Sequence, residues 1–87
     1  MKKTVLITGA TSGIGLGCAR KFAENGDRVI LTARNQQRLE EIRDELKEKG
    51  TEVLILAFDV RDREAATKAV NSLPADWQDI DVLVNNA

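Results

Sequence analysis

The sequence predicts an α/β protein built on a doubly wound parallel sheet, and two observations carry that prediction. Short apolar runs rich in β-branched residues alternate with segments whose apolar residues recur every three or four positions, giving the order β-α-β-α-β-α-β. The connections are short, and parallel strands joined by right-handed helical crossovers form a layered sheet. We therefore expect four strands in the order 3-2-1-4, with two helices on one face and the third on the other.

The first third of the chain predicts a strand, a glycine-rich turn and a helix. Residues 4–8 are a short apolar and β-branched run that stops at a glycine, which is typical of a strand. A helix is expected next, because Ile14, Cys18 and Phe22 recur every four residues along one apolar face, with Ala19 and Ala23 beside them. Gly26 closes this helix.

The middle of the chain predicts two strands around the most regular helix. Residues 28–33 give the second strand, and Asn35 is a suitable N-cap for the helix that Gly50 closes. The inward face of this helix is formed by apolar residues at helical spacing, Leu39, Ile42 and Leu46. Residues 53–58 are continuously apolar, as expected of a parallel strand that is covered on both faces.

The last third predicts a helix and a strand at the edge of the sheet. Asp62 can cap this helix and Pro74 ends it, and its inward face would carry Ala66, Val70 and Leu73. Residues 80–84 give the fourth strand. Its nearly unbroken apolar sequence would lie at an edge, so self-association through this strand is expected unless something covers it.

Length and composition exclude several classes of function. Eighty-seven residues make at most one small domain, and 13 Lys and Arg against 14 Asp and Glu argue against nucleic-acid binding. No run approaches the ~18 apolar residues of a membrane span. The lone Cys18 excludes an internal disulfide and argues against a metal site, so we expect a soluble, cytoplasmic protein. With no His and no Tyr, many common acid–base catalysts are absent, and no catalytic residue is predicted.

The turn after the first strand carries three glycines in the spacing G-x-x-x-G-x-G. Gly9 permits a sharp exit from the strand, while Gly13 and Gly15 would let the backbone approach a pyrophosphate without interference from a Cβ. The helix start then offers free N–H groups and a positive dipole end to an anion. A plain turn would need only one or two glycines, so the spacing favours nucleotide binding.

Three motifs in this order resemble the amino-terminal signatures of the short-chain dehydrogenase/reductase family: Thr8-Gly9-x-x-x-Gly13-Ile14-Gly15, Asp59-Val60 and Asn85-Asn86-Ala87. Residues 73–77, leading into residues 81–87, are most similar to the branch of NADP-dependent 3-hydroxy acid (serine-type) dehydrogenases. The resemblance implies that residues 1–87 are the amino-terminal part of a single Rossmann-like dinucleotide-binding domain. It also implies a parent oxidoreductase that transfers hydride between nicotinamide and an alcohol or carbonyl.

The corner after the second strand indicates which dinucleotide is preferred. An NAD site has a carboxylate there, whereas residues 32–37 contain no acid and one guanidinium, Arg34. A guanidinium can bind a 2′-phosphate in bidentate fashion, so NADP(H) is favoured over NAD(H). The alternative is that Arg34 is a solvated loop cation.

The resemblance also assigns residues to the adenosine. Asp59 would accept a hydrogen bond from the adenine amino group and Val60 would pack near the ring, although Asp59 could instead be a charge at a helix start. By the same resemblance, Asn86 and Ala87 would line the ribose and steady the fourth strand, although an Asn pair after a strand is also common in turns. The predicted cofactor-binding residues are thus Gly9, Thr11, Ser12, Gly13, Ile14, Gly15, Arg34, Asp59, Val60, Asn86 and Ala87.

The family's catalytic Ser, Tyr and Lys lie beyond the fourth strand, and none can be carried over to this sequence. The chain alone is therefore expected to be inactive and to meet an alcohol or carbonyl substrate only as part of a longer protein. The alternative is a non-catalytic half-domain that binds nucleotide weakly or self-associates. A signalling or redox-sensing domain is disfavoured by the three glycines and by the lack of an acidic cluster after the first strand.

Overall fold

The computed structural model describes residues 2–86 and contains one parallel sheet of four strands. Their order is β3-β2-β1-β4, which confirms the predicted 3-2-1-4 arrangement. The strands are β1 (Thr4–Ile7), β2 (Arg28–Ala33), β3 (Val53–Ala57) and β4 (Val82–Val84). Strand β1 pairs with β2 on one side and with β4 on the other, and all these pairs are parallel. The order in which successive strands are added to the sheet therefore changes direction at β1.

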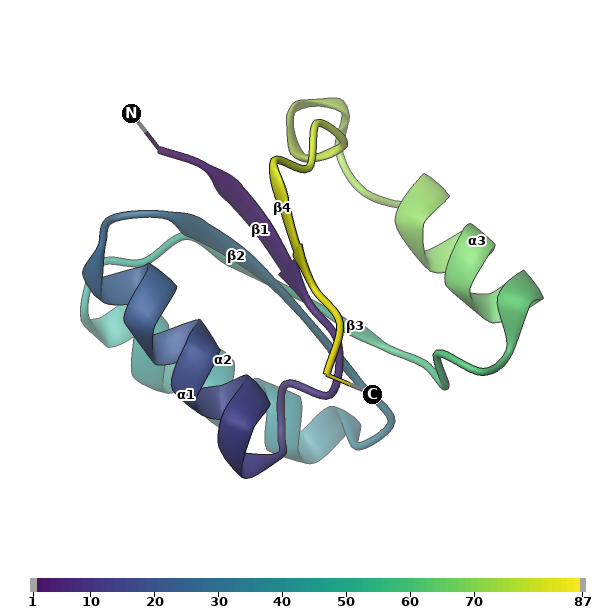
Figure 1. Cartoon of the computed structure of the whole chain (residues 1–87), viewed down its shortest axis with the longest axis horizontal. Helices are drawn as coiled ribbons and strands as arrows, with labels where there is room; N and C mark the ends of the chain where they lie inside the picture. Colours follow the sequence, from purple (N-terminus) through teal and green to yellow (C-terminus); the bar gives the residue numbers. More distant parts are fainter. Residues whose placement is uncertain (1, 87) are drawn as a thin grey trace.

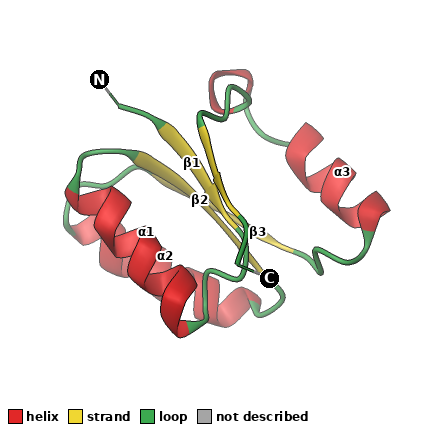
Figure 2. Ribbon diagram, in the orientation of Figure 1, coloured by secondary structure: helices red, strands yellow, loops and turns green. Residues whose placement is uncertain are grey.

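The helices divide between the two faces as expected. Helices α1 (Gly13–Glu24) and α2 (Gln36–Glu48) cover one face, and α3 (Arg63–Asn71) lies on the other (Figures 1 and 2). Two predicted caps are confirmed. Asn35 Oδ1 accepts from the Arg38 N–H at 3.0 Å, and Asp62 Oδ1 accepts from the Ala65 N–H at 3.1 Å. The fold therefore follows from local signals that agree with one another.

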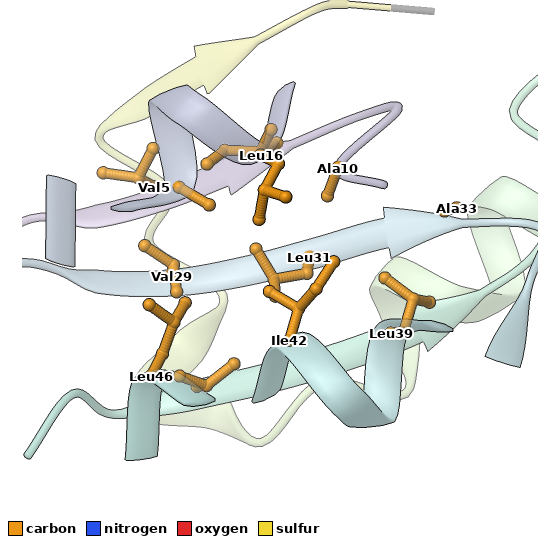
Figure 3. Packing of buried hydrophobic residues seen from close by; sticks show 12 residues of the cluster. Val5, Ala10, Leu16, Val29, Leu31, Ala33, Leu39, Ile42 and Leu46 are labelled. Atoms are coloured by element: carbon orange, nitrogen blue, oxygen red, sulfur yellow. The ribbon is translucent and has the colours of Figure 1, made fainter. Parts of the chain in front are cut away.

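The main core lies between the sheet and the pair α1 and α2. Side chains of β1 and β2 meet those of the helices in Figure 3, and the predicted α2 face is fully packed there. Its three side chains are at most 2% exposed, Leu39, Ile42 and Leu46. The predicted face of α1 is confirmed in part, because Ala19 is buried, together with Gly15 and Leu16, which were not predicted there. Cys18 and Phe22 are only partly buried, and Ile14 is 74% exposed.

The opposite face of the sheet is covered more thinly. Leu6 and Ile30 form its small core with Leu73, and none of the residues of α3, all of them described, is buried. Leu73 is buried as predicted but follows the end of the helix, because α3 stops at Asn71 and the chain turns at Ser72, whose backbone N–H bonds back to Lys68.

The two outer strands also differ from prediction. Strand β3 occupies one edge of the sheet, so only Val53 of its five residues is buried, and the expected cover on both faces is incomplete. Strand β4 begins at Val82 rather than at residue 80, because residues 78–80 form a turn before Asp81 donates its N–H to the Thr4 carbonyl. Leu83 of β4 is 62% exposed. Over residues 2–86, no helix is both long and apolar enough to cross a bilayer.

Candidate functional site

The predicted site residues meet at one edge of the sheet, where the carboxyl ends of the parallel strands lie. The glycine-rich turn follows β1, Arg34 follows β2, and Asp59 lies two residues beyond β3. Asn86 follows β4 by two residues. Parallel strands deliver their following loops to the same edge, and here the order reverses at β1, where ligands bind in doubly wound sheets.

The three glycines of the turn lie in different structural surroundings, so a side chain would have a different effect at each position. Gly9 has a φ of 61°, and a Cβ there would lie 2.8 Å from the Asn86 carbonyl oxygen. A Cβ on Gly15 would collide with the Gly9 carbonyl, so the helix start packs directly on the turn. The expectation that Gly15 makes room for a ligand is therefore incomplete, because its own chain already requires a glycine there. A Cβ on Gly13, by contrast, would meet no described atom within 4 Å beyond its own neighbours.

The start of α1 differs from the starts of α2 and α3. Within the described chain, no side chain caps α1, whereas Asn35 and Asp62 cap the other two helices, and α1 like α2 has no acid in its first turn. The Ser12 hydroxyl instead donates to the Gly9 carbonyl at 2.9 Å, which closes the turn on itself. The first N–H groups of α1 and the positive end of its dipole thus remain available to an anion.

Asn86 joins the end of the chain to the turn. Its side-chain Nδ2 donates to Ser12 Oγ at 2.7 Å and to the Gly9 carbonyl at 3.3 Å. Its backbone N–H donates to Thr8 Oγ1 at 2.8 Å. Asn86 therefore fixes the turn from β4, a role that the resemblance assigned only in part to this position.

A cavity of about 340 Å³ opens beside the turn at this edge. Its walls come from the ends of β1, β2 and β3, and its lining residues are Gly9, Thr11, Ala33, Arg34, Phe58, Asp59, Val60 and Arg61. Five predicted site residues are among them. Ser12, Gly13, Ile14, Gly15 and Asn86 lie in or against the turn outside this lining, and Ala87 lies outside the described residues.

Three lining residues were not predicted as site residues, Ala33, Phe58 and Arg61. Arg61 binds Asp59 closely, since Arg61 Nη2 donates to Asp59 Oδ2 at 2.9 Å and Arg61 Nε donates to Oδ1 at 3.1 Å. The Arg61 backbone N–H also donates to Oδ1 at 2.9 Å. The spacing of an Arg two residues after an Asp was the available signal, because it is short enough for such a ring of hydrogen bonds.

These contacts keep Asp59 ionised. Hydrogen bonds from the Arg61 side chain and backbone lower the pKa of Asp59 to about 2, and the charges of Arg61 and Arg34 act in the same direction. Asp59 lies three residues before Asp62, the N-cap of α3, so its alternative role as a charge near the helix start stays a prediction. The Asp59 carbonyl accepts the Asp62 N–H at 2.9 Å, which shapes the loop into α3.

The strand order, the glycine-rich first turn and the cavity at the carboxyl ends define a Rossmann-like α/β protein. More particularly, the chain belongs to the short-chain dehydrogenase family, whose model matches residues 3–87. The family resemblance expected from the three motifs is confirmed.

Similar proteins include the NADP-dependent 3-hydroxy acid dehydrogenase of Salmonella typhi, which is 54% identical over 83 residues, 95% of this chain and 32% of that protein. The serine 3-dehydrogenase of Agrobacterium fabrum is 48% identical over the full chain and 34% of its own length. The chain thus spans about a third of the curated relatives it matches.

Solved structures agree with this assignment. The closed form of serine dehydrogenase complexed with NADP+ is 49% identical, with a TM-score of 0.89 over 97% of this chain and 33% of its own. The L-sorbose reductase of Gluconobacter frateurii, complexed with NADPH and L-sorbose, is 44% identical. Its TM-score is 0.91 over 99% of this chain and 33% of its own.

Proposed function

We propose that residues 1–87 are the amino-terminal part of a single dinucleotide-binding domain and hold the adenosine and pyrophosphate of NADP(H). The observation that carries this proposal is the cavity that joins the glycine-rich turn to Arg34 and Asp59. The relatives named above as NADP-dependent or complexed with NADP+ or NADPH support the choice of dinucleotide.

The residues present fit the parts of this cofactor. The uncapped start of α1 and the open space at Gly13 suit a pyrophosphate, which accepts hydrogen bonds from backbone N–H groups. The exposed Arg34 at the cavity suits a 2′-phosphate. Asp59 offers an ionised acceptor to the adenine amino group, and Val60 lines the same wall.

The parent protein, in this proposal, is a short-chain oxidoreductase that transfers hydride between the nicotinamide and an alcohol or carbonyl. The similarity to 3-hydroxy acid dehydrogenases favours a 3-hydroxy acid as substrate. The chain described here would bind and orient the adenosine half of the cofactor, and the reacting groups would come from a longer protein. A cytoplasmic location stays a prediction from the sequence.

Calorimetric titration of the chain tests the choice of cofactor. We expect adenosine 2′,5′-bisphosphate and NADP(H) to bind more tightly than 5′-AMP and NAD(H). The double variant Ala33→Asp with Arg34→Leu should prefer NAD(H) and 5′-AMP over NADP(H) and the bisphosphate. Its affinity for adenosine 2′,5′-bisphosphate should fall by at least about tenfold, because the charge-assisted hydrogen bonds to the 2′-phosphate are lost.

Arg38→Leu is the matched control, because it removes the same charge four residues away, where Arg38 pairs with Glu41 on α2. This variant should retain the preference. An unchanged preference in the double variant would show that Arg34 is only a solvated loop cation, and no binding of any of these nucleotides would contradict the proposed function.

A second candidate is self-association through β4, favoured by the exposed Leu83 on this edge strand. An edge strand presents unpaired backbone groups to a second chain, and β4 carries no charge to prevent pairing. A non-catalytic half-domain that pairs in this way would need no cofactor.

A further inference from the structure

The adenosine cavity contains a charge that the proposed function leaves without a role. Its lining carries two guanidinium groups and one carboxylate, from Arg34, Arg61 and Asp59. Arg34 is assigned to the 2′-phosphate and Asp59 to the adenine. Arg61 is two residues from Asp59 and has a side chain that is 77% exposed, yet its guanidinium is held on the carboxylate.

The Arg61 pair leaves room for an adenine amino group on Asp59. A carboxylate offers roughly four acceptor positions. Arg61 occupies two on Oδ1, through its backbone N–H at 2.9 Å and Nε at 3.1 Å. On Oδ2 it has one good contact, from Nη2 at 2.9 Å, with Nε at a longer 3.3 Å. One acceptor direction on Oδ2 therefore remains for a ligand, and Arg61 is not simply a competitor for the site.

The charge of Asp59 would otherwise oppose Arg34. A phosphate monoester carries roughly −1.5 to −2 charges at neutral pH. A bare carboxylate in the same cavity would repel it, as the acid of an NAD site does. With Arg61 bound, the pair of Asp59 and Arg61 has no net charge. The net charge of the cavity lining is then the positive charge of Arg34.

We propose that Arg61 is a specificity-determining residue of the adenosine cavity: by pairing with Asp59 it cancels the carboxylate charge and so favours nucleotides that carry a 2′-phosphate. This role rests on the proposed function. Arg61 acts through Asp59 and needs no contact with the phosphate. Because the pair is partly exposed, its effect on selectivity should be modest and should weaken as salt is added.

The test measures a ratio of affinities, that of adenosine 2′,5′-bisphosphate to that of 5′-AMP, by calorimetry at low ionic strength. Arg61→Gln should lower this ratio by about fivefold, and Arg61→Lys, which retains the charge, should lower it less. Arg63→Gln is the matched control, since it removes the same charge at the first residue of α3, outside the cavity lining. It should leave the ratio unchanged.

A double variant separates charge cancellation from loop structure. In Asp59→Asn with Arg61→Gln both charges are gone, so the ratio should return close to its original value even if adenine binds less tightly. If the affinity ratio of the double variant stayed as low as that of Arg61→Gln, Arg61 would act only by shaping the loop. An Arg61→Gln ratio equal to that of Arg63→Gln would also overturn this role while the proposed function stands. If the unmodified chain bound neither nucleotide, the role of Arg61 and the proposed function would both be contradicted.

Discussion

At the scale of single residues, the glycine-rich turn is held by contacts within the protein as much as by the demands of a ligand. Gly9 adopts a left-handed backbone conformation next to Asn86, and Gly15 packs on the Gly9 carbonyl. A side chain at either position would push the turn away from β4. Of the three glycines of the turn, Gly13 alone would place a Cβ with no described atom within 4 Å beyond its own neighbours, so the space kept free there is best explained by a bound molecule.

We expect Gly15→Ala to destabilise the protein by about 1–3 kcal/mol, because the new Cβ overlaps backbone that has no room to move. Chemical denaturation followed by circular dichroism measures the free energy of unfolding. Gly17→Ala is the control on the same helix, since its Cβ would meet no described atom within 4 Å. That change should stabilise α1 by about 0.5–1 kcal/mol. Equal losses in both variants would contradict the packing explanation.

Sequence reasoning found the turn but not every reason for it. The spacing of Gly9, Gly13 and Gly15 indicated nucleotide binding, yet it could not show that Gly15 meets the backbone six residues earlier. The same limit applies to Ile14, which has the right period for a buried face but is turned outward because Gly15 and Leu16 face the core. Periodicity defines a helix better than it defines the rotation of its first turn.

At the scale of elements, the two faces of the sheet differ in how firmly their helices are held. Helix α2 buries three large side chains, while α3 buries none of its nine residues, all within the described chain. The sheet face under α3 retains an apolar cavity of about 820 Å³ lined in part by Leu6, Val70 and Leu83. Burial of apolar surface is the main term that holds a helix on a sheet, so α3 has the weaker attachment.

We expect the amides of α3 to exchange with solvent much faster than those of α2, at rates set by local opening rather than by global unfolding. Hydrogen exchange followed by NMR measures this for each residue. As a mutational comparison, Leu46→Ala should cost about 2–5 kcal/mol, and Val70→Ala distinctly less. Equal protection of the two helices would show that α3 is held more tightly than its burial indicates.

Element boundaries were predicted less well than element types. Within residues 2–86, the four strands and three α-helices were found and the caps Asn35 and Asp62 were identified correctly, but the short 3-10 helix Ala75–Trp77 was not predicted. The end of α3 was misplaced because Leu73 keeps the helical period although the chain has already turned. For β3 a continuous apolar run indicated burial on both faces, and only the sheet order shows that the strand lies at an edge.

At the scale of the whole molecule, the sheet has two free edges and one thinly covered face. The strand order could be predicted because parallel crossovers of one hand allow few alternatives. How completely the helices cover each face of the sheet could not be predicted, since this depends on how closely each helix approaches the sheet. Arg61 was missed for a similar reason, because its partner is identified by side-chain geometry and not by any motif.

We expect the chain to form dimers through β4 that light scattering after size exclusion would detect. Leu83→Lys should shift the protein toward monomer, because a charge on an edge strand opposes pairing. Thr67→Lys adds the same charge on the exposed side of α3 and should have no such effect. A clean monomer at high concentration in the unmodified chain would contradict pairing through this edge.

The contacts of Asn86 also determine when the site can exist. They join residues 74 to 78 positions apart, so the glycine-rich turn, which is synthesised early, takes its final shape only after β4 has docked. Contacts between residues this distant in sequence require the largest loss of chain entropy, and they tend to form late in folding. Nucleotide binding would therefore report on the docking of β4, and a ligand added before that step of folding should find no competent turn to bind.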